Sequence, residues 1–337
     1  GGPRGRGRWP GAGSARRVLQ RTLGRTGRTV SSIGLGTWQL GADWGDVSEA
    51  DAFAVLDAAA EAGVSFFDTA DVYGDGRSES LIGAWRAAHP EADVMVATKM
   101  VRRAAEPDAA ALSLENMRAW TDRSRRNLGV DTLDLVQLHC PRAEVYANDR
   151  IFDDLDRLVA DGAIAAYGVS VETCAEAMSA NARPGVASVQ LILNAFRLKP
   201  LDEVLPAAEA SGVGIIARVP LASGLLSGRY GHDTTFAAND HRTFNRHGES
   251  FDVGETFSGV DFDRGVEAAR AFAELAAEAG LAPATAALAW LAQLPGVSTV
   301  IPGARNVMQA RTNAAAGSVP PLGEAFDRLP GLQVRLG

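Results

Sequence analysis

Eight short apolar runs, each followed by a stretch with helical periodicity, constrain the fold of this chain more than any other feature of its sequence. The runs are continuous rather than alternating, as in parallel strands that are buried on both faces. Alternation of strands with helices is typical of a parallel sheet whose strands are joined by crossover helices. We expect the strands at 35–38, 64–67, 94–98, 133–138, 165–169, 186–191, 213–217 and 297–301.

Amphipathic stretches predict the helices that cover these strands. They lie at 48–62, 78–88, 113–128, 151–160, 173–180, 201–210, 264–279, 283–291 and 306–315. Ser48 is expected to cap the first of them, and Gly129 is placed as a glycine that ends a helix. Two further apolar segments, at 18–23 and 29–33, flank the turn 24–28 and predict an N-terminal β-hairpin.

Eight such units over about 300 residues favour a closed (β/α)8 TIM barrel, an α/β fold, over two doubly wound domains. The Rossmann alternative is weaker because Gly34-Leu35-Gly36 lacks the third glycine at the required spacing. We predict a disordered Arg/Gly-rich tail at 1–17, the barrel at 18–316, and a C-terminal tail of uncertain structure at 317–337. The long aperiodic segment 220–263, after the seventh strand, is expected to form a lid over the site.

Composition and charge exclude several classes of protein. The net charge of -8 favours no nucleic-acid partner, and no apolar run reaches the length of a membrane span. Two cysteines are too few for a disulfide scaffold. We therefore expect a cytoplasmic protein, monomeric or weakly homo-oligomeric, without nucleic acid or membrane partners. For the first 28 residues, which hold eight arginines and no acid, we favour a mis-set start over a nucleic-acid-binding tail.

Four reactive side chains follow three consecutive strands. Asp68 and Tyr73 follow the second strand, Lys99 the third and His139 the fourth. In a barrel of this kind the C-terminal strand ends meet at one mouth, so these side chains should converge there. Only two of the 33 basic residues are lysines, Lys99 and Lys199, which favours a chemical role for Lys99 that arginine cannot perform.

These side chains have the properties needed to protonate a carbonyl oxygen. An ammonium beside a phenol lowers the phenol pKa from about 10, and a carboxylate such as Asp68 can hold Lys99 in place. His139 can orient the oxygen by a hydrogen bond. No side chain delivers hydride, so a nicotinamide cofactor is implied. Schiff-base lyase chemistry on Lys99 remains an open alternative.

The chain from about residue 18 to residue 316 resembles the aldo-keto reductase superfamily. The resemblance rests on the motifs at 34–38, 67–74, 98–99, 138–139, 168–170, 189–190, 220–226 and 301–305, and on Asn313. It implies an NADPH-dependent reductase of aldehydes or ketones, with Asp68, Tyr73, Lys99 and His139 as the catalytic tetrad and Tyr73 as the proton donor. It also leaves open a cofactor-binding regulatory subunit of a membrane channel, without significant turnover.

The resemblance further implies that NADP(H) lies extended across the barrel mouth. The expected cofactor-binding residues are Gly36, Thr37, Trp38, Asp68, Ser170, Gln190, Arg218, Leu221, Ser223, Gly224, Leu225, Gly303, Ala304, Arg305, Gln309 and Asn313. Ser170 and Gln190 would hold the carboxamide, the residues from 221 to 225 the pyrophosphate, and the helix start after Gly303 the 2′-phosphate and adenine. Trp44, with Tyr73 and His139, is expected to border the substrate; no metal is expected.

Two positions depart from the family pattern. Val171 stands where many relatives have asparagine, and Arg218 stands where many have tyrosine or tryptophan. Because the charge of Arg218 would oppose the positive ring of NADP⁺, we expect relatively tighter binding of the reduced cofactor.

Overall fold

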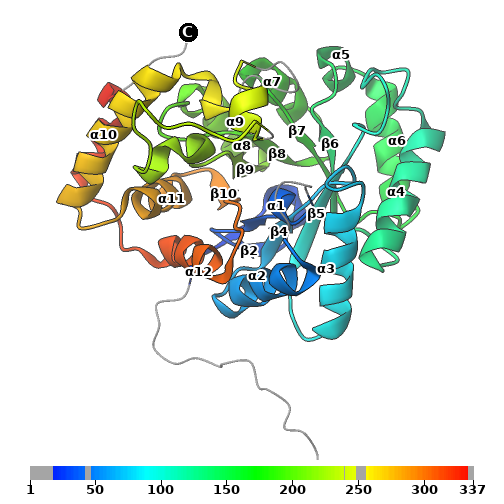
Figure 1. Cartoon of the computed structure of the whole chain (residues 1–337). Helices are drawn as coiled ribbons and strands as arrows, with labels where there is room; N and C mark the ends of the chain where they lie inside the picture. Colours follow the sequence, from blue (N-terminus) through cyan, green and yellow to red (C-terminus); the bar gives the residue numbers. More distant parts are fainter. Residues whose placement is uncertain (1–17, 42–46, 239, 248–255, 333–337) are drawn as a thin grey trace, which may run out of the picture.

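Eight parallel strands form a barrel with helices around it (Figure 1). The computed structural model describes residues 18–41, 47–238, 240–247 and 256–332, so the predicted tail at 1–17 lies outside the described residues. The strands are β3 (Leu35–Gly36), β4 (Phe66–Asp68), β5 (Met95–Met100), β6 (Leu135–His139), β7 (Tyr167–Ser170), β8 (Val186–Ile192), β9 (Gly214–Arg218) and β10 (Val297–Val300). Each pairs with its neighbour in chain order, and parallel bridges Ile33–Val300 and Gly36–Gly303 join the first strand to the last. The predicted (β/α)8 barrel is confirmed.

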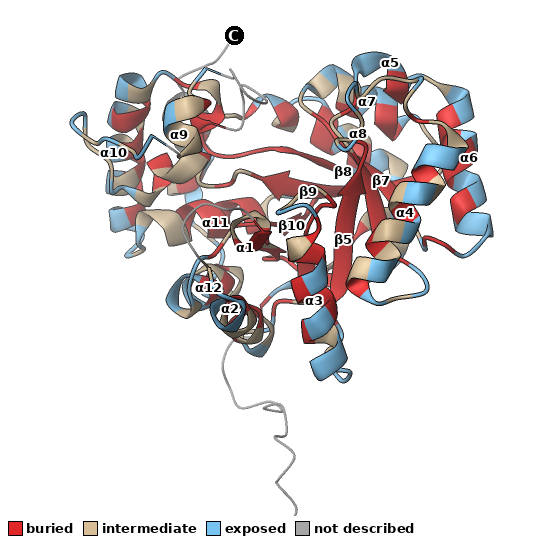
Figure 2. Ribbon diagram, turned by 45° about the vertical axis from the view of Figure 1, so that its right-hand side comes forward, coloured by how far each residue is buried: buried red, intermediate tan, exposed pale blue. Residues whose placement is uncertain are grey.

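The strands are buried, whereas the outer faces of the helices are exposed (Figure 2). The longer helices are α2 (Glu49–Glu61), α3 (Arg77–Ala88), α4 (Leu114–Leu128), α6 (Asp149–Ala160), α7 (Cys174–Asn181), α8 (Val204–Ser211), α10 (Phe262–Glu278), α11 (Pro283–Gln293) and α12 (Val307–Ala315). The shorter ones are α1 (Trp38–Gly41), α5 (Ala143–Tyr146) and α9 (His241–Phe244). The Ser48 hydroxyl accepts a hydrogen bond from Asp51 N at 3.1 Å, which confirms the predicted cap of α2.

The predicted strands and helices differ from the observed ones by one to three residues at their ends, and two of these differences have a visible local setting. The first strand stops at Gly36 because the chain turns into α1 at Trp38; Thr37, between them, donates from its N–H and its hydroxyl to Asp68 O. The helix expected at 201–210 begins at Val204, after a separate 3₁₀ turn, η2 (Lys199–Leu201). Pro200 lies within that turn and brings no N–H to a helical ladder.

An N-terminal hairpin closes the end of the barrel where the strands begin. It consists of β1 (Gln20–Thr22) and β2 (Thr29–Ser31) with a 3₁₀ turn, η1 (Gly24–Thr26), between them. Leu23 and Val30 are fully buried in one apolar cluster with Phe66, Met95, Ala97, Leu135, Ile216 and Ile301. Gly24 is required because a Cβ there would lie 2.1 Å from Gly214 N. Because the hairpin fills this end of the barrel, a ligand is expected at the opposite mouth, where the strands end.

The segment after β9 contains η3 (Ala222–Ser227), α9 and η5 (Phe257–Gly259). An aromatic cluster packs inside it, where the ring centroids of Phe236 and Phe257 lie 5.8 Å apart and those of Phe257 and Phe262 lie 5.1 Å apart. The C-terminal segment continues through η6 (Ala316–Ser318) and η7 (Glu324–Leu332). Phe326 is 3% exposed and packs against Phe272 of α10, so residues after 316 contact the barrel.

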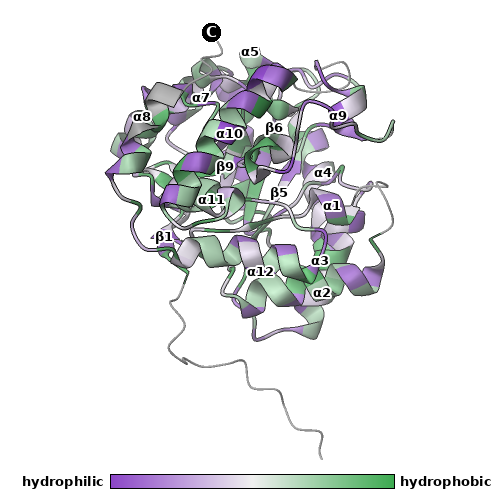
Figure 3. Ribbon diagram, turned by 60° about the vertical axis from the view of Figure 1, so that its left-hand side comes forward, coloured by the Kyte–Doolittle hydropathy of each residue, from purple (hydrophilic) through white to green (hydrophobic). Residues whose placement is uncertain are grey.

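No single helix among the described residues is long and apolar enough to cross a membrane. The pair α10 and α11 meets the length and composition criteria only together, with a bend of 81° between them. Hydrophilic residues recur along α10 (Figure 3). The cytoplasmic location stays a prediction.

Candidate active site

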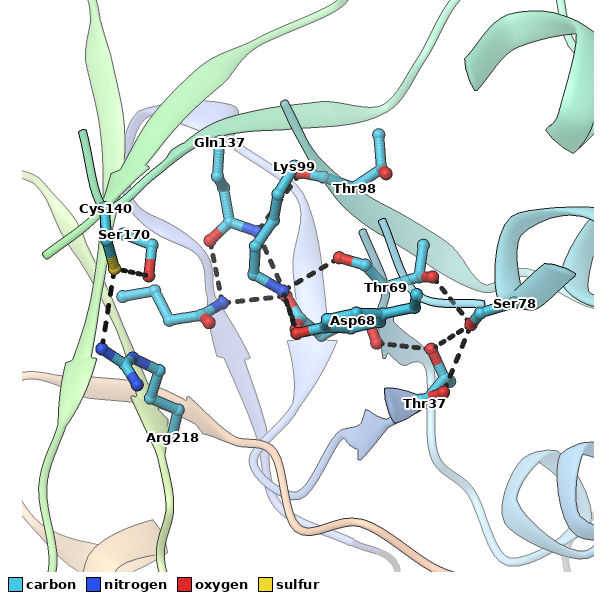
Figure 4. A network of polar contacts seen from close by, with 12 residues as sticks. Thr37, Asp68, Thr69, Ser78, Thr98, Lys99, Gln137, Cys140, Ser170 and Arg218 are labelled. Atoms are coloured by element: carbon cyan, nitrogen blue, oxygen red, sulfur yellow. Dashed lines mark hydrogen bonds and ion pairs between the residues drawn. The ribbon is translucent and has the colours of Figure 1, made fainter. Parts of the chain in front are cut away.

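Lys99 lies at the centre of a hydrogen-bonded group at the C-terminal mouth of the barrel (Figure 4). Its Nζ donates to Asp68 Oδ1 at 2.5 Å, to Thr69 O at 2.9 Å and to Tyr73 Oη at 3.2 Å. Asp68 ends β4 and Lys99 lies in β5, while Tyr73 sits on the turn that leads from β4 to α3. Neighbouring strand ends thus bring the predicted carboxylate, ammonium and phenol into contact.

Burial and charge act in opposite directions on Lys99, which is 1% exposed. Burial alone would lower the pKa of its ammonium, but the charge of Asp68 and the phenol of Tyr73 outweigh burial and raise that pKa. Lys99 is therefore charged at neutral pH. Its positive charge lies beside Tyr73 Oη, the oxygen of the predicted proton donor.

Two glutamines hold the other oxygen of Asp68. Gln137 Nε2 and Gln190 Nε2 donate to Asp68 Oδ2 at 3.1 Å and 2.8 Å, and Gln190 Nε2 also donates to Gln137 Oε1 at 2.9 Å. Sequence reasoning missed Gln137. The available signal was a single amide inside the apolar strand β6, where an unpartnered amide would be costly.

His139, the fourth of the predicted residues, joins this group through a ring contact. It ends β6, and its ring meets the Tyr73 ring edge-on, with 6.2 Å between centroids. Burial, followed by the charges of Arg102, Lys99 and Arg218, holds the pKa of His139 well below its usual range. The imidazole is therefore neutral at neutral pH. Within the described residues its Nδ1 is buried and makes no hydrogen bond.

A cleft of about 650 Å³ opens beside these four side chains. Fourteen of the sixteen predicted cofactor residues line it: Gly36, Thr37, Trp38, Asp68, Ser170, Gln190, Arg218, Leu221, Ser223, Gly224, Gly303, Arg305, Gln309 and Asn313. Leu225 and Ala304 do not line it; each is 1% exposed and packs in the core. Trp44 lies outside the described residues. The cleft therefore connects the tetrad to the start of α12.

Comparison with known proteins identifies the family. The family model described as "Aldo/keto reductase family" matches residues 32–329. The chain belongs to the aldo/keto reductase family.

Individual relatives span nearly the whole chain. An uncharacterised oxidoreductase of Mycobacterium tuberculosis is 33% identical over 306 residues, covering 89% of this chain and 88% of that protein. A probable voltage-gated potassium channel subunit beta of Oryza sativa is 31% identical over 320 residues, covering 90% and 92%. The solved glycerol dehydrogenase of Gluconobacter oxydans superposes with a TM-score of 0.76 at 26% identity and covers 93% of this chain and 94% of its own.

The start of α12 in this aldo/keto reductase is organised by its own side chains. Asn306 accepts a hydrogen bond from Gln309 N at 2.9 Å, and Gln309 Oε1 accepts one from Arg305 N at 2.8 Å. Asn313 Nδ2 donates to Gly303 O at 3.0 Å. Gln309 and Asn313, predicted as ligand contacts, thus also shape the loop from Gly303 to Asn306. Arg305 lines the cleft beside a helix N-terminus, where free N–H groups favour an anion.

Part of the segment expected to form a lid reaches the cleft in this family member. Fifteen lining residues were not among the predicted site residues: Gln39, Val219, Pro220, Ser227, Arg229, Tyr230, His241, Arg242, Ala282, Ala284, Thr285, Ile301, Pro302, Met308 and Thr312. The His241 ring meets the Trp38 ring edge-on at 5.3 Å, which joins the segment after β9 to the residue after β3. Burial lowers the pKa of His241 to about 4, so this contact is made by a neutral ring.

The described part of the chain contains no group of three or more His, Cys, Asp and Glu side chains that could hold a metal ion. His241 pairs with Asp240 and also lies 3.5 Å from the Ser223 hydroxyl.

Proposed function

We propose that this chain is an NADPH-dependent oxidoreductase that reduces an aldehyde or ketone to an alcohol, with Tyr73 as the general acid. The observation that carries the proposal is the chain of hydrogen bonds from Asp68 through Lys99 to Tyr73, which ends at a cleft beside neutral His139. Family membership supports the same reaction class.

The residues of the cleft fit an extended dinucleotide. The tetrad lies at one end, and Arg305 and the α12 N-terminus lie at the other, where they suit a phosphate. The turn of η3, with Ser223 and Gly224 in left-handed conformations, also lines the cleft. An aldo-keto reductase of Schizosaccharomyces pombe, 28% identical over 296 residues and covering 86% of this chain and 84% of its own, carries NADP(+) in its name. These features favour NADPH as the cofactor.

In the proposed reaction, the carbonyl oxygen lies between Tyr73 Oη and the His139 ring. When bound, NADPH supplies the hydride, which no side chain can deliver. Tyr73 gives its proton to the oxygen that becomes the alcohol, and the phenolate that remains is stabilised by the ammonium of Lys99. In the oxidation of an alcohol the same phenolate takes the proton back. His139 contributes a hydrogen bond but no net charge, so the positive charge at this end comes from Lys99 and Arg218.

A fluorescence titration with NADPH, followed by an absorbance assay on 4-nitrobenzaldehyde, tests the proposal. Saturable NADPH binding with turnover is the expected result. Binding without turnover on any carbonyl, with a channel partner that co-purifies, would favour the regulatory role that the rice relative's name describes. A carbonyl compound that borohydride traps on Lys99 would favour the lyase, since a reductase forms no covalent adduct there. Absence of NADPH binding would remove the cofactor assignment.

Arg218 is expected to make the enzyme discriminate between the two redox states of its cofactor. It ends β9, lines the cleft, and its charge contributes to the low pKa of His139. The oxidised nicotinamide ring is positive and the reduced ring is neutral, so we expect NADPH to bind more tightly than NADP⁺. In Arg218→Tyr, the ratio of the dissociation constant of NADP⁺ to that of NADPH should fall by about tenfold, or ~1.4 kcal/mol.

Arg305→Gln is the matched control for this measurement. It removes a positive charge from the opposite end of the cleft, where both redox forms carry the same phosphates. Both dissociation constants should rise together and their ratio should stay constant. A ratio that Arg218→Tyr leaves unchanged would contradict the role of Arg218, even if NADPH binds well.

A further inference from the structure

The turn that carries Tyr73 is bound at two of its backbone carbonyls by Arg123, from the neighbouring helix α4. Arg123 of α4 donates from Nη1 to Asp71 O at 3.2 Å and from Nη2 to Asp75 O at 2.7 Å, and Nη2 also contacts Asp75 Oδ1 at 3.0 Å. Arg103 forms an ion pair with the same Asp75 carboxylate. Arg123 therefore binds the turn two residues before Tyr73 and two residues after it.

Two buried carboxyl groups lie behind this turn and differ in their contacts. Glu79 of α3 accepts hydrogen bonds from Thr98 Oγ1 at 2.5 Å and from Asn127 Nδ2 at 2.8 Å. Asp71 is equally inaccessible, at 0% exposure, but within the described residues its carboxyl oxygens have no hydrogen-bond partner apart from the N–H of the adjacent Val72. A charged carboxylate with so few hydrogen bonds is costly in such a place and is commonly neutralised by a proton. The geometry therefore favours a protonated Asp71.

Burial and the groups around Asp71 together place the pKa of its carboxyl group close to neutral pH. Burial and then the nearby Glu79 raise the pKa of Asp71 to about 7, while Arg103, Arg123 and the N–H of Val72 act in the opposite direction. These groups come from α3, from α4, from the segment after β5 and from the turn itself. A change of pH around neutrality therefore switches a charge that interacts electrostatically with Arg123, which binds the turn.

We propose that Asp71 is a positioning residue for the reaction at Tyr73: loss of the proton from its buried carboxyl group draws Arg123 away from the backbone carbonyls of the turn and displaces the phenol. While Asp71 is protonated, Arg123 bonds to Asp71 O and Asp75 O and the turn keeps Tyr73 within hydrogen-bond distance of Lys99. A carboxylate at Asp71 competes for the same guanidinium. Asp71 does not line the cleft, so the effect reaches the chemical step through Tyr73 and leaves cofactor binding intact. This inference rests on the proposed function only in assigning the proton transfer to Tyr73.

The pH dependence of kcat for NADPH-driven reduction tests this role in the wild-type protein, Asp71→Asn and Asp75→Asn. In the wild type, kcat should fall about tenfold as the pH rises through about 7, a loss expected from a small misplacement of the acid. Asp71→Asn keeps the shape of the protonated side chain without its titration, so this fall should disappear. Asp75→Asn makes the same chemical change at the exposed end of the turn, and in this variant kcat should still fall as the pH rises through about 7. NADPH dissociation constants should be independent of the Asp71 substitution.

An infrared difference spectrum provides a readout that does not depend on turnover. The C=O stretch of a buried carboxylic acid should be present in the wild type below about pH 7, should fade above it, and should be missing in Asp71→Asn. If this band is absent from the wild type, or if kcat falls identically in Asp71→Asn, Asp71 is no positioning residue. If the band is present and titrates but no carbonyl is reduced, the proposed function fails while the protonation of Asp71 stands.

Discussion

Tyr73→Phe is expected to lower kcat for carbonyl reduction by about 10²–10⁴-fold, the contribution usual for a positioned proton donor. The substitution removes the hydroxyl that Lys99 Nζ contacts at 3.2 Å and leaves the ring that packs against His139. NADPH should bind as in the wild type, because the cleft stays open along its length. Single-turnover kinetics with bound NADPH separates the chemical step from product release and checks the loss directly.

Tyr230→Phe is the matched control, because Tyr230 is a second tyrosine that lines the same cleft. Its hydroxyl contacts Arg242 and Ser223 O, away from Lys99, so the chemical step should proceed at nearly the wild-type rate. If Tyr73→Phe retains most of its activity, or if Tyr230→Phe loses as much, the assignment of the proton donor is wrong.

Asp71→Asn is expected to stabilise the protein at alkaline pH and to have little effect in acid. The pKa of Asp71 rises from 3.8 to about 7 on folding, so the folded state holds the proton more strongly than the unfolded state. Stability from this group is therefore fully present below about pH 4 and is lost as the pH rises through about 7. Asparagine does not titrate, so its contribution is not lost at high pH. At about pH 8 the free energy of unfolding of Asp71→Asn can exceed that of the wild type by ~4 kcal/mol.

Urea unfolding of the wild type and Asp71→Asn at about pH 4 and at about pH 8 measures this difference. The contributions of the other titrating groups are common to both proteins and cancel when their free energies of unfolding are subtracted. Asp75→Asn should behave in the opposite way. Its ion pair and hydrogen bond with Arg103, followed by Arg123, lower the pKa of Asp75, so the carboxylate adds stability at neutral pH that the variant loses. A gain for Asp71→Asn that is equal at the two pH values would show that Asp71 does not titrate between them.

The barrel and the convergence of the predicted tetrad follow from local patterns in the sequence. Eight continuous apolar runs lie where buried parallel strands must be, and the polar residue that follows such a run faces the C-terminal mouth. The sequence alone therefore predicts that the side chains of Asp68, Lys99 and His139 lie close together. The capping of α2 by Ser48 was also predictable, because the cap and its partner are three residues apart.

Other parts of the site depend on contacts between distant segments, which local patterns do not specify. Gln137 approaches Asp68 only because β6 lies beside β5, and His241 meets Trp38 although the two rings follow different strands, β9 and β3. The burial of Asp71 depends on α3 and α4 packing behind the turn. Leu225 and Ala304 lie within motifs that line the cleft, yet the local turns direct their side chains into the core.

Because lysine is scarce, only one side-chain amine among the described residues of this barrel is accessible to a reagent in solvent. Of the two lysines, Lys99 is 1% exposed and bonded to Asp68, whereas Lys199 is exposed at the start of η2. An amine-reactive dye should therefore attach to the barrel at Lys199 without any engineered cysteine. A dye excited by the emission of bound NADPH would then report cofactor arrival by energy transfer from one defined point on the scaffold.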